Sequence, residues 1–127
     1  MPEMDYEAME AAITLKTKAI ITVDLGGIVC DYDRVFEAVE RKRGLFTPIE
    51  ADGSPLGDLS SRIQKAIGRV AVVADCAHSL GASRTVGEKR KNCGAIADFT
   101  SFSFHAVNVL EKAREVENGF NVGKYAA

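Results

Sequence analysis

Four side chains able to take part in acid–base or nucleophilic chemistry lie within the string DCAHSLGA. They are Asp75, Cys76, His78 and Ser79, and they follow directly after an apolar run. A thiol beside an imidazole is a pairing used in nucleophilic catalysis. Residues two apart on a turning chain need not face each other, however, and no third orienting group is evident, so we expect Cys76 to be a small buried thiol.

A second polar stretch, FTSFSFHAV, contains Ser103 and His105. The two stretches together hold both histidines of the chain. An aspartate such as Asp75 at the end of a buried strand is common in α/β proteins, where it caps a helix or faces solvent. A histidine near the edge of a core is more often hydrogen-bonded than functional. Residue types alone therefore leave a structural and a functional interpretation open.

Three apolar runs predict the strands that position these residues. Lys18 to Leu25 is a β-branched run that ends before Gly26 and Gly27, which are expected to form a turn. Arg69 to Asp75 reads as a second buried strand, and Ala97 to Phe104 alternates with a period of two. The aromatic side chains of the third run are expected to pack in the core. They are Phe99, Phe102 and Phe104.

Helices and one long loop are predicted between and after these strands. DRVFEAVERKRG is expected to form a helix that Asp31 or Asp33 can cap and that ends at Gly44. Leu45 to Ser60 contains two of the three prolines and is predicted to be a surface loop, followed by a short amphipathic helix, LSSRIQKAIG. A last helix is expected from Ala106 to about Glu117. Strands joined by crossover-length links predict an α/β fold with a mostly parallel sheet, in which ligands bind beyond the carboxyl ends of the strands.

Composition narrows the class of protein. The chain has 127 residues, 46% of them hydrophobic, which is typical of a single soluble domain, predicted here over residues 1–127. A formal charge of −2 argues against nucleic acid and anionic membranes as partners. Three widely spaced cysteines argue against disulfides and zinc, and an acidic N-terminus without a long apolar run predicts a cytoplasmic protein.

The predicted strand from Lys18 to Leu25, with the two glycines that follow it, also resembles a phosphatase motif, but the motif is incomplete. Asp24 in ITVDLGG is similar to the nucleophile of haloacid-dehalogenase phosphatases, but their motif has a second aspartate where this chain has Gly26. Gly26 and Gly27 do not form a phosphate loop either, because no GxGxxG or GK[ST] pattern follows the strand.

Three blocks in order resemble the DegT/DnrJ-type sugar aminotransferases, fold type I enzymes that use pyridoxal phosphate to aminate keto sugars on nucleotides. DCAHSLGA resembles the D-A-A-H or D-A-A-Q block of that family, with Cys76 in place of the usual alanine. KTKAIITVDLGG resembles its strand-plus-glycine segment, and GAIADFTSFSFHAV resembles its G-D-x-x-x-F-S-F-H-x-x-K block. The resemblance covers about residues 11–107. It implies a partial large domain of the pyridoxal-phosphate transferases, with a three-layer α/β/α arrangement.

The resemblance implies a cofactor role for three side chains. Asp75 would face the pyridine nitrogen and keep the ring protonated, so that the ring can act as an electron sink. His78 would touch the phenolic oxygen of the ring, and Ser103 would hydrogen-bond the phosphate. His105 would lie close by.

The chain also departs from the family pattern. The lysine that binds the cofactor covalently follows FSFHxx directly in the family, and here that position is Asn108, which cannot form the bond. Lys112 lies about one helical turn further on, without support for its reach to the same carbon. The glycine-rich turn that follows in the family is also absent, so we expect no catalytic residue and no covalently held pyridoxal phosphate.

The sequence therefore predicts a truncated central segment of a nucleotide-sugar aminotransferase that is inactive alone. By resemblance, its substrates would be a nucleotide-linked keto sugar and an amino donor such as glutamate. Surfaces meant for missing parts would favour a homo-oligomer. Two alternatives stay open: a non-catalytic interaction or regulatory α/β domain, and an unrelated flavodoxin-like binding domain.

Overall fold

The computed structural model describes residues 4–104, and these residues form two compact units. The first unit contains residues 4–20 and 33–72, and the second contains residues 21–32 and 73–104. The boundary between the units passes through the strands β1, Ala19–Val23, and β2, Ala71–Asp75. Each unit is therefore described by itself.

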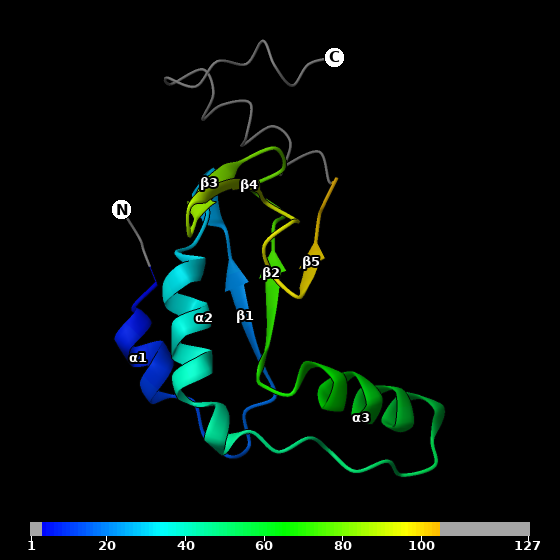
Figure 1. Cartoon of the computed structure of the whole chain (residues 1–127). Helices are drawn as coiled ribbons and strands as arrows, with labels where there is room; N and C mark the ends of the chain where they lie inside the picture. The colour runs from blue at the N-terminus through cyan, green and yellow to red at the C-terminus, as the bar shows by residue number, and fades with distance from the viewer. Residues whose placement is uncertain (1–3, 105–127) are drawn as a thin grey trace, which may run out of the picture. The chain divides into compact units, whose positions relative to one another are not determined.

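A three-stranded sheet of order β1-β2-β5 confirms the predicted α/β fold with a mostly parallel sheet (Figure 1). Strand β5 is Phe99–Ser101 and runs parallel to β2, with Val73 opposite Phe99 and Asp75 opposite Ser101. Within the second unit, the Asp24 N–H donates to the Asp75 carbonyl at 3.0 Å. All three strands lie within the apolar runs from which they were predicted, because β-branched residues suit a buried strand.

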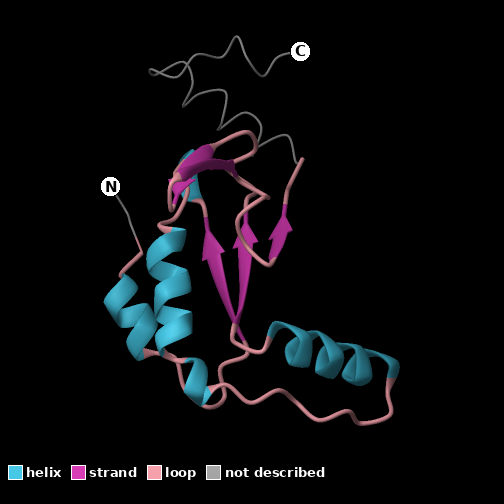
Figure 2. Cartoon of the chain, viewed as in Figure 1, coloured by secondary structure: helices cyan, strands magenta, loops and turns pink. Residues whose placement is uncertain are grey.

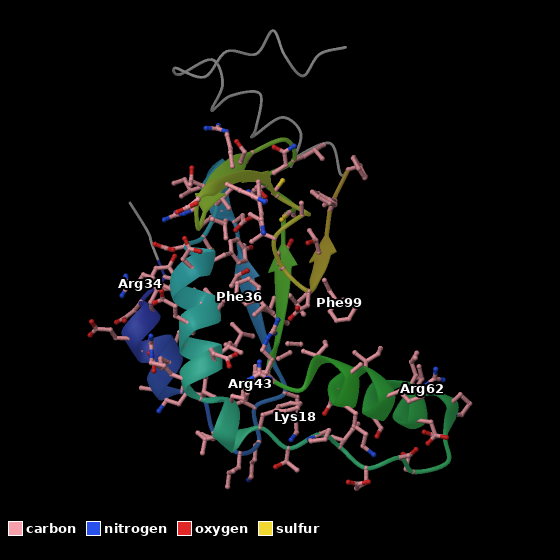
Figure 3. The ribbon with its side chains drawn as sticks, viewed as in Figure 1. Lys18, Arg34, Phe36, Arg43, Arg62 and Phe99 are labelled. Carbon is pink, nitrogen blue, oxygen red and sulfur yellow. The ribbon has the colours of Figure 1, made fainter. Side chains whose placement is uncertain are left out.

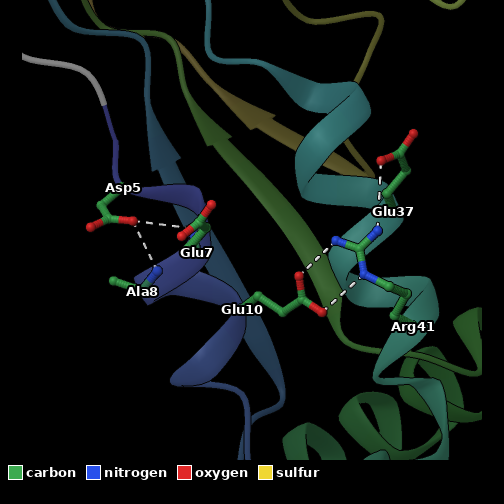
Figure 4. A network of polar contacts seen from close by, with 6 residues as sticks. All are labelled: Asp5, Glu7, Ala8, Glu10, Glu37 and Arg41. Carbon is green, nitrogen blue, oxygen red and sulfur yellow. Dashed lines mark hydrogen bonds and ion pairs between the residues drawn. The ribbon is translucent and has the colours of Figure 1, made fainter.

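Two helices of the first unit lie side by side (Figure 4). Helix α1 is Tyr6–Ala11, and its cap is Asp5, whose carboxylate accepts from the N–H groups of Glu7 and Ala8. Helix α2 is Tyr32–Arg41, so the helix is present as predicted but ends at Arg41 instead of Gly44, which lies in a 3₁₀ turn over Arg43–Leu45. The Arg41 guanidinium binds both carboxylate oxygens of Glu10, at 3.0 and 2.6 Å. The buried hydrophobic residues of this unit are Tyr6, Ile13, Val35, Ala38, Val39, Val70 and Val72.

Helix α3 spans Pro55–Ile67 and corrects the predicted loop, which was expected to continue to Ser60. Proline lacks a backbone N–H and disrupts helix interiors. At the first helical position it is tolerated, because a backbone N–H there would have no partner within the helix. The Ser54 hydroxyl accepts from the Gly57 N–H at 3.0 Å and caps the helix, which ends at Gly68 in a left-handed conformation. Proline in this stretch therefore marks the beginning of a helix and not the middle of a loop.

The cap of α3 gives a first testable prediction. Replacing Ser54 by alanine removes the acceptor for the Gly57 N–H and should lower the free energy of unfolding by about 1 kcal/mol. Urea unfolding followed by circular dichroism measures the change. Ser54→Thr keeps the hydroxyl and is the matched control. Equal losses for both variants would show that the cap does not stabilise the helix.

The second unit contains a β-hairpin within the stretch SLGASRTVGEKRKNCG, where no strand is predicted from the sequence. Strand β3 is Ser83–Val86 and strand β4 is Lys89–Asn92, and they pair antiparallel with Val86 opposite Lys89. Gly87 begins the two-residue connection with φ +60°, a conformation that favours glycine. The hairpin is polar, so an apolar strand pattern is missing from its sequence.

Burial alternates along the strands of the second unit. Thr22 and Ala74 are buried, whereas the neighbouring Ile21 and Val23 are 68% and 49% exposed. Phe99 is 46% exposed at the start of β5 (Figure 3), and Phe102 and Phe104 are also exposed, which contradicts the prediction that these rings pack in the core. One face of the sheet in this unit is therefore open and largely apolar. Among residues 4–104, no helix has the length and apolar character needed to cross a membrane (Figure 2).

Candidate functional site

Asp75 lies at the carboxyl end of β2 in a row of side chains on the open face of the sheet. Ser101, the last residue of β5, is its register partner on one side. The hydrogen bond from the Asp24 N–H to the Asp75 carbonyl places Val23 on its other side, because residues of parallel strands pair in this pattern. Asp75 is partly exposed, whereas Val23 and Ser101 are exposed. The row offers a carboxylate between an apolar side chain and a hydroxyl.

The turn after β2 orients the Asp75 carboxylate and carries His78. Oδ1 of Asp75 accepts from the Ala77 N–H at 3.1 Å. The Ser79 N–H donates to the Cys76 carbonyl at 3.1 Å and closes a tight turn, with His78 partly buried within it. We call residues 75–79 the β2 turn. It is further tied to β5, because the Cys76 N–H donates to the Ser101 carbonyl at 2.9 Å.

Ser103 follows two residues after the end of β5 and is partly buried. The structure therefore brings Asp75, His78 and Ser103 to the same edge of the sheet within the second unit. Three other residues of the sequence analysis lie outside the described residues, as does the helix predicted from Ala106; they are His105, Asn108 and Lys112. The cofactor roles assigned to the three side chains stay predictions.

A buried polar cluster beside the β2 turn was missed by the sequence analysis. Its centre is the Asp24 carboxylate, which is 0% exposed. Oδ1 accepts from the Cys30 N–H at 3.0 Å and from the Tyr32 hydroxyl at 3.1 Å. Oδ2 accepts from the Cys76 thiol at 3.4 Å and from the Ser79 hydroxyl at 3.3 Å. An aspartate inside an apolar run is the one sign of this cluster in the sequence, since its donors come from separate segments.

The thiols of this cluster are poor nucleophiles. Burial raises the pKa of Cys30 to about 12, and the negative charge of Asp24 adds to the shift. Burial likewise raises the pKa of Cys76 to about 12; a hydrogen bond with Ser79 opposes the shift and Asp24 adds to it. Because the thiolate is the reactive form, neither thiol is activated at neutral pH. Cys76 is 1% exposed, so the prediction of a small buried thiol is confirmed.

The hairpin and the segment after β1 are fastened to the same region. Arg84 of β3 forms an ion pair with Asp31 at 2.9 Å and donates to the Val29 carbonyl at 3.0 Å. The Cys93 thiol donates to the Ser79 carbonyl at 2.6 Å. The segment after β1 and the hairpin with the residue that follows it are therefore both tied to the region at the end of β2. In residues 4–104, no group of three or more metal-binding side chains is assembled.

The donor set at the sheet edge fits one side of pyridoxal phosphate. A pyridine ring needs a carboxylate for its nitrogen and apolar contact for its face, and Asp75 and Val23 lie next to each other on the open face. The Ser103 hydroxyl and the His78 imidazole belong to residues that follow β5 and β2 at the same edge of the sheet. Oδ1 of Asp75 accepts from the Ala77 N–H, and a carboxylate has further acceptor sites that a ligand can use.

Comparison with known proteins identifies the family to which the chain is similar. The sequence profile of the DegT/DnrJ/EryC1/StrS aminotransferase family matches residues 2–47 and 33–114. The spore coat polysaccharide biosynthesis protein SpsC of Bacillus subtilis is 31% identical over 107 residues, which are 84% of this chain and 20% of that protein. An uncharacterised protein of Methanocaldococcus jannaschii is 33% identical over 81% of this chain and 19% of its own length.

Solved structures of a putative sugar aminotransferase, Spr1654 of Streptococcus pneumoniae, are similar in fold as well. Its apo and PLP forms both match with 53% sequence identity and a TM-score of 0.64, over 83% of this chain and 23% of that protein. Its PMP form matches with a TM-score of 0.63. The chain thus spans about a fifth to a quarter of the length of these relatives.

Proposed function

Because this chain belongs to the DegT/DnrJ/EryC1/StrS aminotransferase family, we propose that its second unit holds one side of pyridoxal phosphate in a sugar aminotransferase. The observation that carries the proposal is the row of Val23, Asp75 and Ser101 on the open face of the sheet. The relative Spr1654 has solved PLP and PMP forms at 53% identity, which supports the choice of cofactor. Membership of the family also removes the unrelated flavodoxin-like alternative.

Each residue of the site has a distinct task in this proposal. The Asp75 carboxylate holds a proton at the ring nitrogen of the cofactor, and the Ala77 N–H keeps the carboxylate in place. When bound, a protonated pyridine ring supplies an electron sink for the reaction at the substrate. His78 donates or accepts a hydrogen bond at the ring oxygen. Ser103 binds the phosphate through its hydroxyl.

The transfer itself needs groups beyond this site. Position 108, where the family resemblance puts the amine that binds the cofactor, is asparagine, so we propose that the described residues bind the cofactor without a covalent bond. A nucleotide-linked keto sugar and an amino donor are the proposed substrates of the complete reaction. The open apolar face with Ile21 and Phe99 supports self-association as the proposed oligomeric behaviour.

Titration with pyridoxal phosphate tests the proposal. The full chain should change the absorbance spectrum of the cofactor saturably, and Asp75→Asn should weaken binding at least about tenfold, because the neutral amide no longer balances the ring cation. Glu88→Gln, an exposed charge removed from the hairpin turn, is the matched control and should bind as the unmodified chain does. Equal binding by all three proteins would reject Asp75 as the ring partner.

Borohydride reduction followed by peptide mass spectrometry tests the non-covalent part. We expect no stoichiometric cofactor adduct at a single lysine, because position 108 has no amine. A stoichiometric adduct at Lys112 would contradict this expectation and would identify Lys112 as the covalent attachment site.

A further inference from the structure

Asp24 holds the β2 turn at three of its five residues. Its N–H donates to the Asp75 carbonyl at 3.0 Å, and its Oδ2 accepts from the side chains of Cys76 and Ser79 at 3.4 and 3.3 Å. The two remaining residues of the turn are Ala77 and His78. The Ala77 N–H is the group that orients the Asp75 carboxylate. One residue, directly after the strand next to β2, therefore fixes the backbone from which both proposed cofactor-facing groups extend.

Burying the Asp24 carboxylate costs free energy, so its hydrogen bonds are needed to keep the folded state stable. Asp24 is 0% exposed, and among the described residues its donors are a backbone N–H, a phenol, a thiol and a hydroxyl, none of which carries a charge. A buried carboxylate without enough hydrogen bonds is strongly destabilising. Hydrogen bonds to an ionised acceptor are about twice as strong as neutral ones, so the four donors can offset the loss of water and hold the oxygens in fixed directions.

The two oxygens of Asp24 face different segments. Oδ1 binds the segment after β1 through the Cys30 N–H and the Tyr32 hydroxyl, whereas Oδ2 binds the β2 turn. The Ser79 carbonyl, at the end of this turn, also accepts from the Cys93 thiol at 2.6 Å. The β2 turn is consequently held by Asp24, directly after β1, and its last residue is also bound by the segment after the hairpin.

We infer that Asp24 is a positioning residue, which sets the orientation of Asp75 and His78 by holding the β2 turn through Oδ2. This inference rests on the proposed cofactor site for its functional meaning, whereas the geometry of the β2 turn can be measured without cofactor. The contacts at Oδ1 contribute to stability, and the contacts at Oδ2 contribute to the orientation of the site. Substitutions on the two sides of Asp24 should therefore differ in their effect.

The experiment compares Cys76→Ala/Ser79→Ala, which removes both donors to Oδ2, with Tyr32→Phe, which removes one donor to Oδ1. Amide hydrogen exchange at Ala77 and the ring signals of His78 are recorded by NMR on the full chain without cofactor. The chain has two histidines, so His105→Gln assigns the His78 signals. Asp24→Asn is the third variant and removes the charge while it retains the shape of the side chain.

The double variant should exchange the Ala77 N–H at least about tenfold faster and shift the His78 ring signals, as should Asp24→Asn. Tyr32→Phe should leave both close to those of the unmodified chain, whatever its global stability. The inference would be overturned if the exchange rate and the His78 signals of every variant, Tyr32→Phe included, changed simply in proportion to its loss of free energy of unfolding. Cofactor titration then separates the two proposals. If the unmodified chain does not bind pyridoxal phosphate, the proposed cofactor site is rejected, but the exchange experiment still decides whether Asp24 positions the β2 turn.

Discussion

Tyr32→Ala is expected to lower the free energy of unfolding by about 3–5 kcal/mol, the range for removal of a large ring from a core. The Tyr32 side chain is 1% exposed, and its hydroxyl contacts Thr22 at 2.9 Å and Asp24 at 3.1 Å. Truncation leaves a cavity and removes a donor from a buried carboxylate. Small domains have only about 5–15 kcal/mol of stability in total, so the variant should be close to unfolding. Urea unfolding monitored by circular dichroism gives the change.

Tyr32→Phe separates the ring from its hydroxyl. This variant keeps the packing and should lose only about 1–3 kcal/mol, since a buried acceptor loses one of its partners. If Tyr32→Ala costs no more than Tyr32→Phe, the ring does not fill the core and the large effect predicted for its removal is wrong.

The strands could be predicted because the residue types and the periodicity that favour a strand are local features of the sequence. β1 and β2 are β-branched apolar runs, and β5 lies in an alternating stretch, so each needs only neighbouring residues to be recognised. Helix α1 was missed because it has six residues, too few for a periodic pattern. It depends on contacts that no local pattern shows, such as the Arg34 guanidinium 4.5 Å from the centre of the Tyr6 ring.

The candidate site could be predicted only in part, for a related reason. Asp75 and Ser103 were identifiable because each follows or lies in a strand, and carboxyl ends of parallel strands meet at one edge. The Asp24 cluster joins residues up to 55 positions apart, so its donors are evident only once the chain has folded. The phenylalanines of β5 were expected in the core because alternation marks two faces without showing which of them is covered.

Stability should fall steeply between pH 9 and pH 12, mainly because of the thiols around Asp24. Burial raises the pKa of both Cys30 and Cys76 from 9.0 to about 12, and it also raises the pKa of the Tyr32 hydroxyl. Below pH 9 each thiol is protonated in both states, so its contribution to stability is complete. Between pH 9 and pH 12 the unfolded chain releases these protons and the folded chain retains them, which favours unfolding as the pH rises. Each thiol can contribute about 1 kcal/mol per pH unit, less for the half-buried Cys30, where solvent screens the charge.

The free energy of unfolding from urea titrations at several pH values measures this fall. Cys30→Ala/Cys76→Ala should flatten the curve over the same interval, because the groups whose protons are lost on unfolding are gone. Ser61→Ala is the matched control: it removes a buried hydroxyl, 2% exposed, that does not titrate in this range, so its curve should run parallel to that of the unmodified chain. If the double variant also runs parallel, burial together with the charge of Asp24 does not hold the two thiols in their protonated form, and the raised pKa values must be abandoned.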